Sequence, residues 1–123
     1  MIKSKQQKFT LNNKYDLEDR TFNFAKNCRK YVKSLKTSVI NIEDGKQLIR
    51  SSGSVGANYI EANEKLGDKD FKFRLKIARK EAKESGYWLR LLKDSNPDSD
   101  LAQNLIEESI ELRKILSSIL KKA

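Results

Sequence analysis

The sequence predicts an all-α protein: an antiparallel, up-down-up-down four-helix bundle over residues 15–123, preceded by a basic N-terminal tail over residues 1–14. In four consecutive segments, apolar residues recur with alternating spacings of four and three, the pattern of helices that pack around a shared seam. No segment shows the period of two that a half-buried strand requires. Only short runs of turn and cap residues separate the segments, and short connections place successive helices antiparallel.

The first two segments carry clear helical rows. In the first segment the row contains Leu17, Thr21, Phe24, Cys28, Tyr31 and Leu35. In the second segment it contains Leu48, Ser52, Val55, Tyr59, Ala62 and Leu66. The run TSVIN at 37–41 lies between them and supplies β-branched and capping residue types, as expected at a helix boundary.

The second segment also contains the run GSVG at 53–56, which at first sight resembles a phosphate-binding loop. Such a loop follows a strand and ends in Lys followed by Ser or Thr, and neither feature is present. Gly53 and Gly56 instead fall on one helical row with Ile49 and Ile60. Because an interior glycine costs up to about 1 kcal/mol relative to Ala, we expect these glycines to let a neighbouring helix approach closely.

The third and fourth segments are bounded by stop and start signals. Gly67 is predicted to end the second helix, and Asp68 to cap the third. For the fourth helix, either Asn96 is the cap and Pro97 the first helical residue, or Asp98 is the cap. The third row contains Phe71, Leu75, Ala78, Ala82, Ser85, Leu89 and Leu92. The fourth row contains Leu101, Leu105, Glu108, Leu112, Ile115 and Ile119, and is widened by Ala102, Ile106, Leu116 and Leu120.

The third segment carries more apolar surface than one seam requires. The additional residues are Phe73, Ile77, Tyr87, Trp88 and Leu91. One interpretation is a wide stripe that serves a thick bundle. We favour the other, a contact with a second subunit, because Phe73 and Tyr87 fall near the outward face and aromatic residues are enriched at interfaces.

The sequence offers no recognisable catalytic, metal or cofactor site. It contains no histidine, which removes the commonest general base and the commonest transition-metal ligand. Its single cysteine, Cys28, lies on the core row without a partner base, so we predict a small buried residue. Glu108 lies on an apolar row, where we expect it to pair with an Arg or Lys of another helix or to lie at a subunit contact, in preference to acting as a buried general acid. We therefore expect a protein that is not an enzyme.

The chain also lacks the apolar stretches that membranes require. Nothing approaches the length of about eighteen apolar residues that crosses a bilayer. Residues 1–14 contain no apolar signal region, and a single cysteine fits a reducing compartment. These features predict a cytoplasmic protein with no membrane association.

Positive charge is the strongest functional signal. The net charge is +9, and residues 1–14, 15–38 and 68–93 are basic, whereas 39–67 and 94–123 are slightly acidic. Two outward helix faces carry candidate nucleic-acid contacts: Lys26, Arg29, Lys30 and Lys33 on the first segment, and Lys69, Lys72, Lys76, Lys80 and Lys83 on the third. Such faces suit phosphate backbones, and no base-reading motif is evident. The alternative is that both faces are simply solvated.

Four stretches carry a resemblance to a known family. They are YDLEDRTFNFA (15–25), QLIRSSGSVGANYIEA (47–62), KDFKFRLKIARKEAKESGYWLRLL (69–92) and ELRKILSSILKK (111–122). Together they are similar to the four-helix bundle family of 23S rRNA intervening-sequence proteins. The resemblance covers nearly all of residues 15–123, and its most specific phrase runs from Arg50 to Ala62.

This resemblance implies a small cytoplasmic bacterial protein that assembles as a homopentamer, with nucleic-acid binding as its leading function. The family resembles in turn the accessory protein of diversity-generating retroelements, a basic bundle that works with a reverse transcriptase and nucleic acid. It implies no catalytic residue. We therefore predict a non-enzymatic oligomer that binds RNA or DNA through the basic faces of the first and third helices. The alternative is a protein-interaction scaffold or an accessory subunit for an enzyme such as a polymerase.

Overall fold

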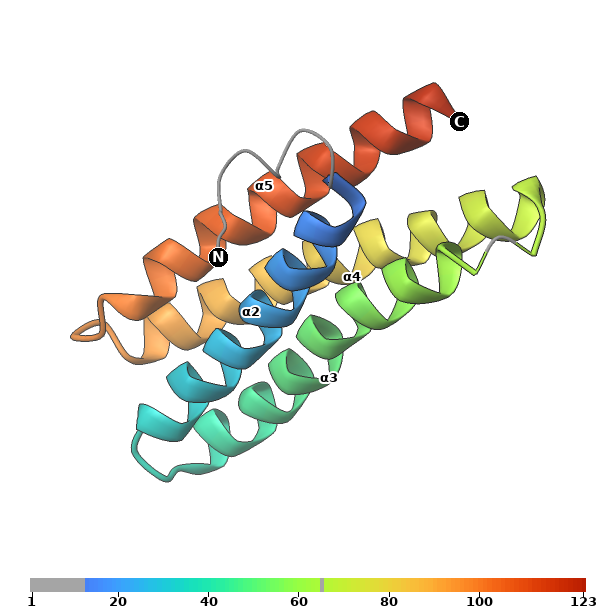
Figure 1. Cartoon of the computed structure of the whole chain (residues 1–123). Helices are drawn as coiled ribbons and strands as arrows, with labels where there is room; N and C mark the ends of the chain where they lie inside the picture. Colours follow the sequence, from blue (N-terminus) through green and yellow to red (C-terminus); the bar gives the residue numbers. More distant parts are fainter. Residues whose placement is uncertain (1–12, 65) are drawn as a thin grey trace, which may run out of the picture.

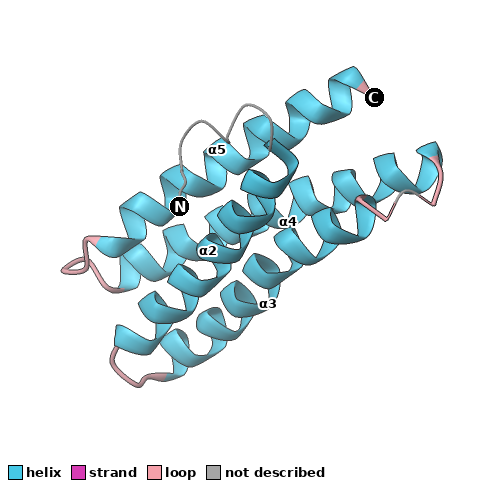
Figure 2. Cartoon of the chain, in the orientation of Figure 1, coloured by secondary structure: helices cyan, strands magenta, loops and turns pink. Residues whose placement is uncertain are grey.

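The protein is a bundle of helices in the computed structural model, which describes residues 13–64 and 66–123. Over these residues the chain forms α2 (Asn13–Ser34), α3 (Val39–Ala62), α4 (Asp68–Ser95) and α5 (Leu101–Lys122), and no strand (Figures 1 and 2). The predicted all-α, antiparallel four-helix bundle is therefore confirmed. Helix α2 begins two residues before the predicted boundary, and the rest of the predicted basic tail, residues 1–12, lies outside the described residues.

The helices are arranged so that each contacts its two neighbours in a ring. Helix α3 packs against α2 and α4, and α5 packs against α4 and α2 (Figure 1). Helices α2 and α4 make no contact with each other within the described residues, because they occupy diagonal corners of the bundle. The two helices that carry the predicted basic faces are thus diagonal partners, which limits how their surfaces can combine.

The core is built by the predicted rows on α2, α3 and α4. Its largest fully buried side chains include Tyr31, Phe24, Leu48, Leu75, Leu89 and Leu112. Two predicted core positions are wrong: Leu66 is 78% exposed and Leu101 is 51% exposed. Leu66 fails because α3 ends at Ala62, so the row does not reach it.

On α5 the buried row keeps Leu105 and Leu112 of the predicted row and takes in Ala102 and Leu116, which were predicted to widen it, together with Ser109. It consists of Ala102, Leu105, Ser109, Leu112 and Leu116. Glu108 is half-buried, and Ile115 and Ile119 pack against the edge of the core. The small residues of this row let α5 lie close to the bundle, although they give little apolar signal in the sequence.

The helix boundaries differ from two of the predicted caps. Helix α3 begins as expected, since the Ser38 side chain accepts a hydrogen bond from the Asn41 backbone N–H at 3.0 Å. Helix α4 is preceded by Gly67 at φ 141°, a left-handed conformation that favours glycine, so Asp68 is the first helical residue and not the cap. The Asp68 carboxylate still lies in the first turn, where its negative charge interacts favourably with the helix dipole.

The connection from α4 to α5 is the second boundary that differs. Asn96 ends α4 and does not begin α5, and α5 starts only after Asp100. The Asn96 amide exchanges hydrogen bonds with the Asn41 amide at 2.9 and 3.1 Å. This reciprocal pair ties the end of α4 to the start of α3, an attachment across the bundle that a cap prediction from local sequence does not anticipate.

Two glycines let helices approach each other closely. A Cβ atom at Gly56 would lie 2.8 Å from the Thr21 hydroxyl oxygen, so α2 and α3 touch at this point. A Cβ atom at Gly86 would lie 2.9 Å from the Ser109 hydroxyl oxygen, so α4 and α5 touch there. The predicted packing role of the GSVG run is therefore confirmed at Gly56, and Gly86 plays the same role for α4 and α5.

Cys28 is fully buried on α2, as predicted. Burial raises the pKa of the Cys28 thiol from its ordinary value of 9.0 to about 12, with the Ser52 hydroxyl and the Arg29 guanidinium acting in the opposite direction. A thiol in this state is a poor nucleophile at neutral pH. The side chain therefore fills space in the core.

The buried thiol predicts a loss of stability in alkali. Because the folded pKa of Cys28 lies above the unfolded value, stability is fully present below pH 9 and falls as pH rises towards 12. We expect the free energy of unfolding to drop by about 1 kcal/mol between pH 9 and pH 10, from the one proton that only the unfolded state loses. Denaturant titrations at the two pH values measure this drop.

Cys28→Ala is the matched control for this prediction. The variant should show a clearly smaller drop between pH 9 and pH 10, whatever its overall stability. Burial also raises the pKa of Tyr31 and of Tyr59, so the part of the decline that comes from these tyrosines, which begins below pH 10 and continues above it, should persist in the variant. An equal drop in both proteins between pH 9 and pH 10 would contradict the assignment to Cys28.

Candidate functional site

The basic face predicted on the third helix divides into two parts. Lys72 and Lys76 line a cleft between α4 and α5. Lys69, Lys80 and Lys83 are exposed on α4 and do not line it. The Lys80 ammonium lies 3.8 Å from the Glu84 carboxylate on the same helix. The five lysines that sequence spacing placed on one face therefore have two different surroundings.

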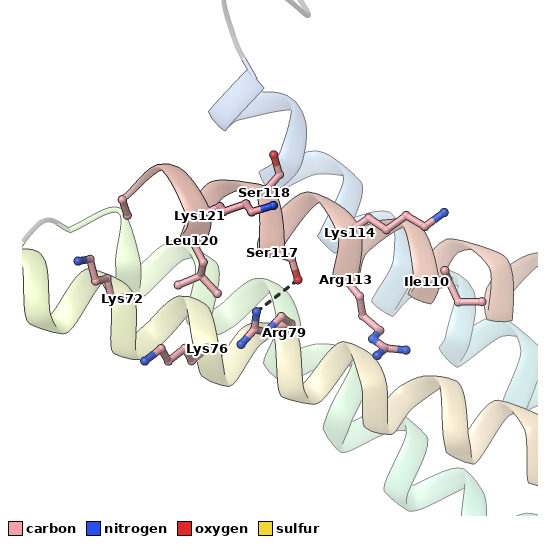
Figure 3. Close-up of a pocket in the computed structure, with 11 residues that line it drawn as sticks. Lys72, Lys76, Arg79, Ile110, Arg113, Lys114, Ser117, Ser118, Leu120 and Lys121 are labelled. Atoms are coloured by element: carbon pink, nitrogen blue, oxygen red, sulfur yellow. Dashed lines mark hydrogen bonds between the residues drawn. The ribbon is translucent and has the colours of Figure 1, made fainter.

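A basic cleft lies between α4 and α5, with a volume of about 1080 Å³ (Figure 3). Its six basic residues come from both helices. They are Lys72, Lys76 and Arg79 from α4, and Arg113, Lys114 and Lys121 from α5. The other lining residues are Ile110, Ser117, Ser118, Leu120 and Ala123, so no acidic side chain lines the cleft. We call this feature the basic cleft.

Most of the positive charge in the basic cleft is not neutralised internally. Arg79 donates a hydrogen bond to the Ser117 hydroxyl at 3.3 Å, and Figure 3 shows this guanidinium between the two helices. The Lys114 ammonium lies 3.4 Å from the Glu111 carboxylate, outside the cleft lining. Within the described part of the chain, no ion pair joins the remaining four cleft cations to a carboxylate. The cleft can therefore attract an anion.

Other basic residues of the bundle are engaged in ion pairs that link helices. Arg20 on α2 forms a two-pronged ion pair with Glu108 on α5, at 2.7 and 2.9 Å. The prediction that Glu108 pairs with a basic residue of another helix is thus confirmed. Arg50 on α3 lies 3.7 Å from the buried Glu81 and 3.4 Å from Glu84. Arg20 and Arg50 are therefore paired with carboxylates of other helices. Among the described residues, no ion pair between helices involves a cation of the basic cleft.

The candidate residues on α2 do not join the basic cleft. Lys26, Lys30 and Lys33 are exposed along α2, which lies diagonally opposite α4. Arg29 bends back towards the bundle: it donates to the Ala25 carbonyl at 3.2 Å and to the Ile49 carbonyl of α3 at 3.5 Å. Within one protomer the two predicted basic faces are separate surfaces.

An apolar groove lies between α2 and α3, with a volume of about 530 Å³. Gly53, Gly56 and Ala57 line it together with Phe22, which is 67% exposed, and with the exposed Ile60. No pattern in the sequence predicts this groove. A possible signal was that Ile60 shares a helical row with Gly53 and Gly56. Phe22 lies on another helix and outside its core row, so no local pattern joins it to these residues.

The predicted subunit contact on α4 is partly exposed and partly buried. Phe73 is 58% exposed and Tyr87 is 54% exposed, while Ile77 and Leu91 are half-buried. Trp88 packs against the core, with its ring edge-on to Tyr87 at a centroid distance of 5.3 Å. Exposed aromatic residues suit a subunit contact, which stays a prediction.

Four residues of the basic cleft were missed by the sequence analysis: Arg79, Arg113, Lys114 and Lys121. A signal for them does exist. In the segment 94–123 every acidic residue precedes Leu112 and every basic residue follows it. The net charge of the segment hides this division, because the acidic half cancels the basic half.

No group of three or more potential metal-ligating side chains occurs among the described residues. Likewise, no helix in the described part of the chain combines the length and the apolar character needed to cross a bilayer.

Comparison with known proteins places the chain in a family. The family model described as 23S rRNA-intervening sequence protein matches residues 13–118. Among curated proteins, none matches the chain. The chain is similar to the crystal structure of a protein with unknown function from the S23 ribosomal protein family of Bacteroides thetaiotaomicron. That protein is 34% identical in sequence, with a TM-score of 0.77 over 88% of this chain and 97% of its own. The match extends over all four helices, and the chain therefore belongs to the 23S rRNA-intervening sequence protein family.

Proposed function

We propose that this protein is a non-enzymatic, cytoplasmic nucleic-acid-binding bundle whose binding surface is the basic cleft between α4 and α5. The observation that supports this proposal is the convergence of six cations from two helices on one concavity that no acidic side chain lines. The outward residues on α2 and the remaining lysines of α4 would then contribute only long-range attraction.

The binding energy of such a site comes mainly from the release of counterions from the phosphates. Each neutralised phosphate of a duplex contributes about −0.9 to the slope of log K against log salt concentration. If all six cleft cations contact phosphates, the slope is about −5. This value is large enough to distinguish a built basic site from diffuse attraction by one or two lysines.

The experiment that tests the proposal is a titration of fluorescently labelled structured RNA and duplex DNA with the full chain. Anisotropy is followed at four or five salt concentrations from 50 to 300 mM, roughly the range over which such sites lose affinity steeply. We expect saturable binding that weakens steeply with salt. Absence of binding at the lowest salt concentration would overturn the proposal.

A second candidate function is a protein-interaction scaffold, for example an accessory subunit of a polymerase. The observation that favours it is the apolar groove between α2 and α3, where Phe22 and Ile60 are exposed. Apolar grooves of this kind accept an amphipathic helix of a partner. Co-expression with the product of a neighbouring gene tests the idea. A complex that survives Phe22→Asp together with Ile60→Asp would exclude this groove as the contact.

We also propose that the chain assembles as a homopentamer, as its resemblance to the family implies. Phe73 and Tyr87 support a subunit contact on α4, because both are large, aromatic and exposed. A ring would place five basic clefts on one particle and so raise the avidity for a long nucleic acid. Analytical ultracentrifugation tests the assembly, and a monomer at micromolar concentration would contradict it.

A further inference from the structure

We infer that the basic cleft binds the sugar-phosphate backbone of a base-paired segment and not the bases of a single strand. This inference rests on the proposed function and names its ligand class. It depends on two properties of the cleft: the side-chain types that line it, and the way the cations are distributed over its two helices.

The first property is the absence of any aromatic side chain from the residues that line the cleft. Proteins that hold single strands without sequence preference combine a basic groove with aromatic rings on which successive bases stack. The exposed aromatic residues among the described residues are Phe22, Phe73 and Tyr87, and none of them lines the basic cleft. An unpaired strand in this cleft would therefore contact only cations, hydroxyls and aliphatic carbons.

The second property is that the cations are divided equally between two facing helices. The three cations of α4 form a row from Lys72 to Arg79 that spans about 10 Å, whereas Arg113 and Lys114 of α5 are consecutive and lie on two adjacent faces of their helix. Figure 3 shows Arg79 and Arg113 between the two helices, and Lys114 and Lys121 on another face of α5 than Arg113.

Cations on two facing helices match the two strands of a duplex. Packed helices lie about 8–10 Å apart, and the grooves of B-form DNA are roughly 6–12 Å wide between their bordering strands. A base-paired segment can therefore place one strand along α4 and the other along α5. A single strand supplies only one row of phosphates and leaves the cations of one helix without partners.

The hydroxyl groups of the cleft are compatible with backbone contacts. Ser117 accepts a hydrogen bond from Arg79 and keeps its own proton available for donation, and Ser118 is exposed beside it. Hydroxyl side chains commonly donate to phosphate oxygens, and such contacts position a protein without reading sequence. The cleft therefore has the chemistry of a backbone site throughout.

The counterion effect gives the expected size of the preference. Slopes are about −0.9 per phosphate contact for a duplex and about −0.7 for a single strand. If both ligands bind equally at 1 M salt, six contacts make the duplex roughly tenfold tighter at 0.1 M salt. Any loss of contacts in the single strand, for the geometric reason above, increases this ratio.

The test compares an RNA hairpin with an unpaired RNA of the same length and phosphate count, each labelled and titrated with the full chain at 0.1 M salt. The expected result is at least about tenfold tighter binding of the hairpin, with little change when the stem sequence is permuted. Equal or tighter binding of the unpaired RNA would overturn the inference while leaving nucleic-acid binding in place. Failure of both RNAs and of duplex DNA to bind would overturn the proposed function itself.

A pair of variants ties the preference to the cleft. Lys72→Glu, Lys76→Glu and Arg113→Glu together should weaken binding of the hairpin and remove most of its advantage. Lys69→Glu, Lys80→Glu and Lys83→Glu together make the same change of charge, on α4 outside the cleft, and should preserve the advantage. If the second variant loses the preference and the first retains it, the cleft is not the site. The comparison of the two RNAs on the unmodified protein needs no variant and decides the ligand class alone.

Discussion

Reversal of three charges in the basic cleft is expected to lower the affinity for duplex nucleic acid by roughly 10²–10³-fold at 0.1 M salt. Each phosphate contact contributes about 0.9 to the logarithm of the binding constant for each tenfold decrease in salt concentration, and the variant loses three such contacts. The variant combines Lys72→Glu, Lys76→Glu and Arg113→Glu. The slope of the salt dependence should decrease in magnitude by about three. Anisotropy titrations of both proteins over the same salt series measure the two quantities together.

The matched control is Lys69→Glu, Lys80→Glu and Lys83→Glu, which changes the net charge equally from exposed positions of α4 outside the cleft. We expect a much smaller effect, since only the long-range field changes. Lys72 and Lys76 are also exposed and Arg113 is half-buried, so both variants should keep the helical circular-dichroism spectrum of the original protein. Equal losses in the two variants would mean that the overall charge and not the cleft determines binding.

Replacement of Leu112 by Ala is expected to lower the free energy of unfolding by about 2–5 kcal/mol, the cost of a large-to-small change in a packed core. Leu112 is fully buried on α5 and belongs to the core formed by all four helices. The cost combines the lost transfer free energy of the removed carbons with the cavity that they leave. Chemical denaturation of the two proteins measures it as a shift of the midpoint.

Leu101→Ala makes the same chemical change on the same helix and serves as the control. Because Leu101 is 51% exposed at the start of α5, we expect a cost of about 0.5 kcal/mol or less. The comparison distinguishes two rotations of α5. If Leu101→Ala proved as costly as Leu112→Ala, α5 would be turned towards the row that contains Leu101 and Glu108.

This contrast shows why the sequence predicts the bundle but misplaces one face. Helix α5 has two adjacent apolar rows, and an α-helix drifts by about 20° per heptad relative to a strict seven-residue repeat. The row with more leucine and isoleucine gives the stronger signal, yet the buried centre contains Ala102 and Ser109. Such small residues are favoured where helices approach closely, and only the neighbour, here Gly86 of α4 against Ser109, reveals the need for them.

Only two of the six cations of the candidate site could be predicted from the sequence. Lys72 and Lys76 were identified because their spacing places them on one side of a helix, which is a local property. Their partners Arg113 and Lys121 lie on another helix, about forty residues later, and are brought opposite by the packing of α5 on α4. Lys80 and Lys83 have the same local pattern as Lys76 but lie outside the cleft. Charge patterns along one helix therefore cannot separate cleft residues from solvated ones.

The measurement that tests the central claim most directly is lysine footprinting of the nucleic-acid complex. Lysines are acetylated with a limiting reagent in the presence and absence of a saturating RNA hairpin, and mass spectrometry gives the protection of each side chain. The basic-cleft account predicts strong protection of Lys72, Lys76, Lys114 and Lys121. It predicts little protection of the exposed Lys30, Lys33, Lys80 and Lys83, which serve as internal controls within the same sample. Protection centred on these control lysines, with the cleft lysines modified at their free rate, would contradict the account.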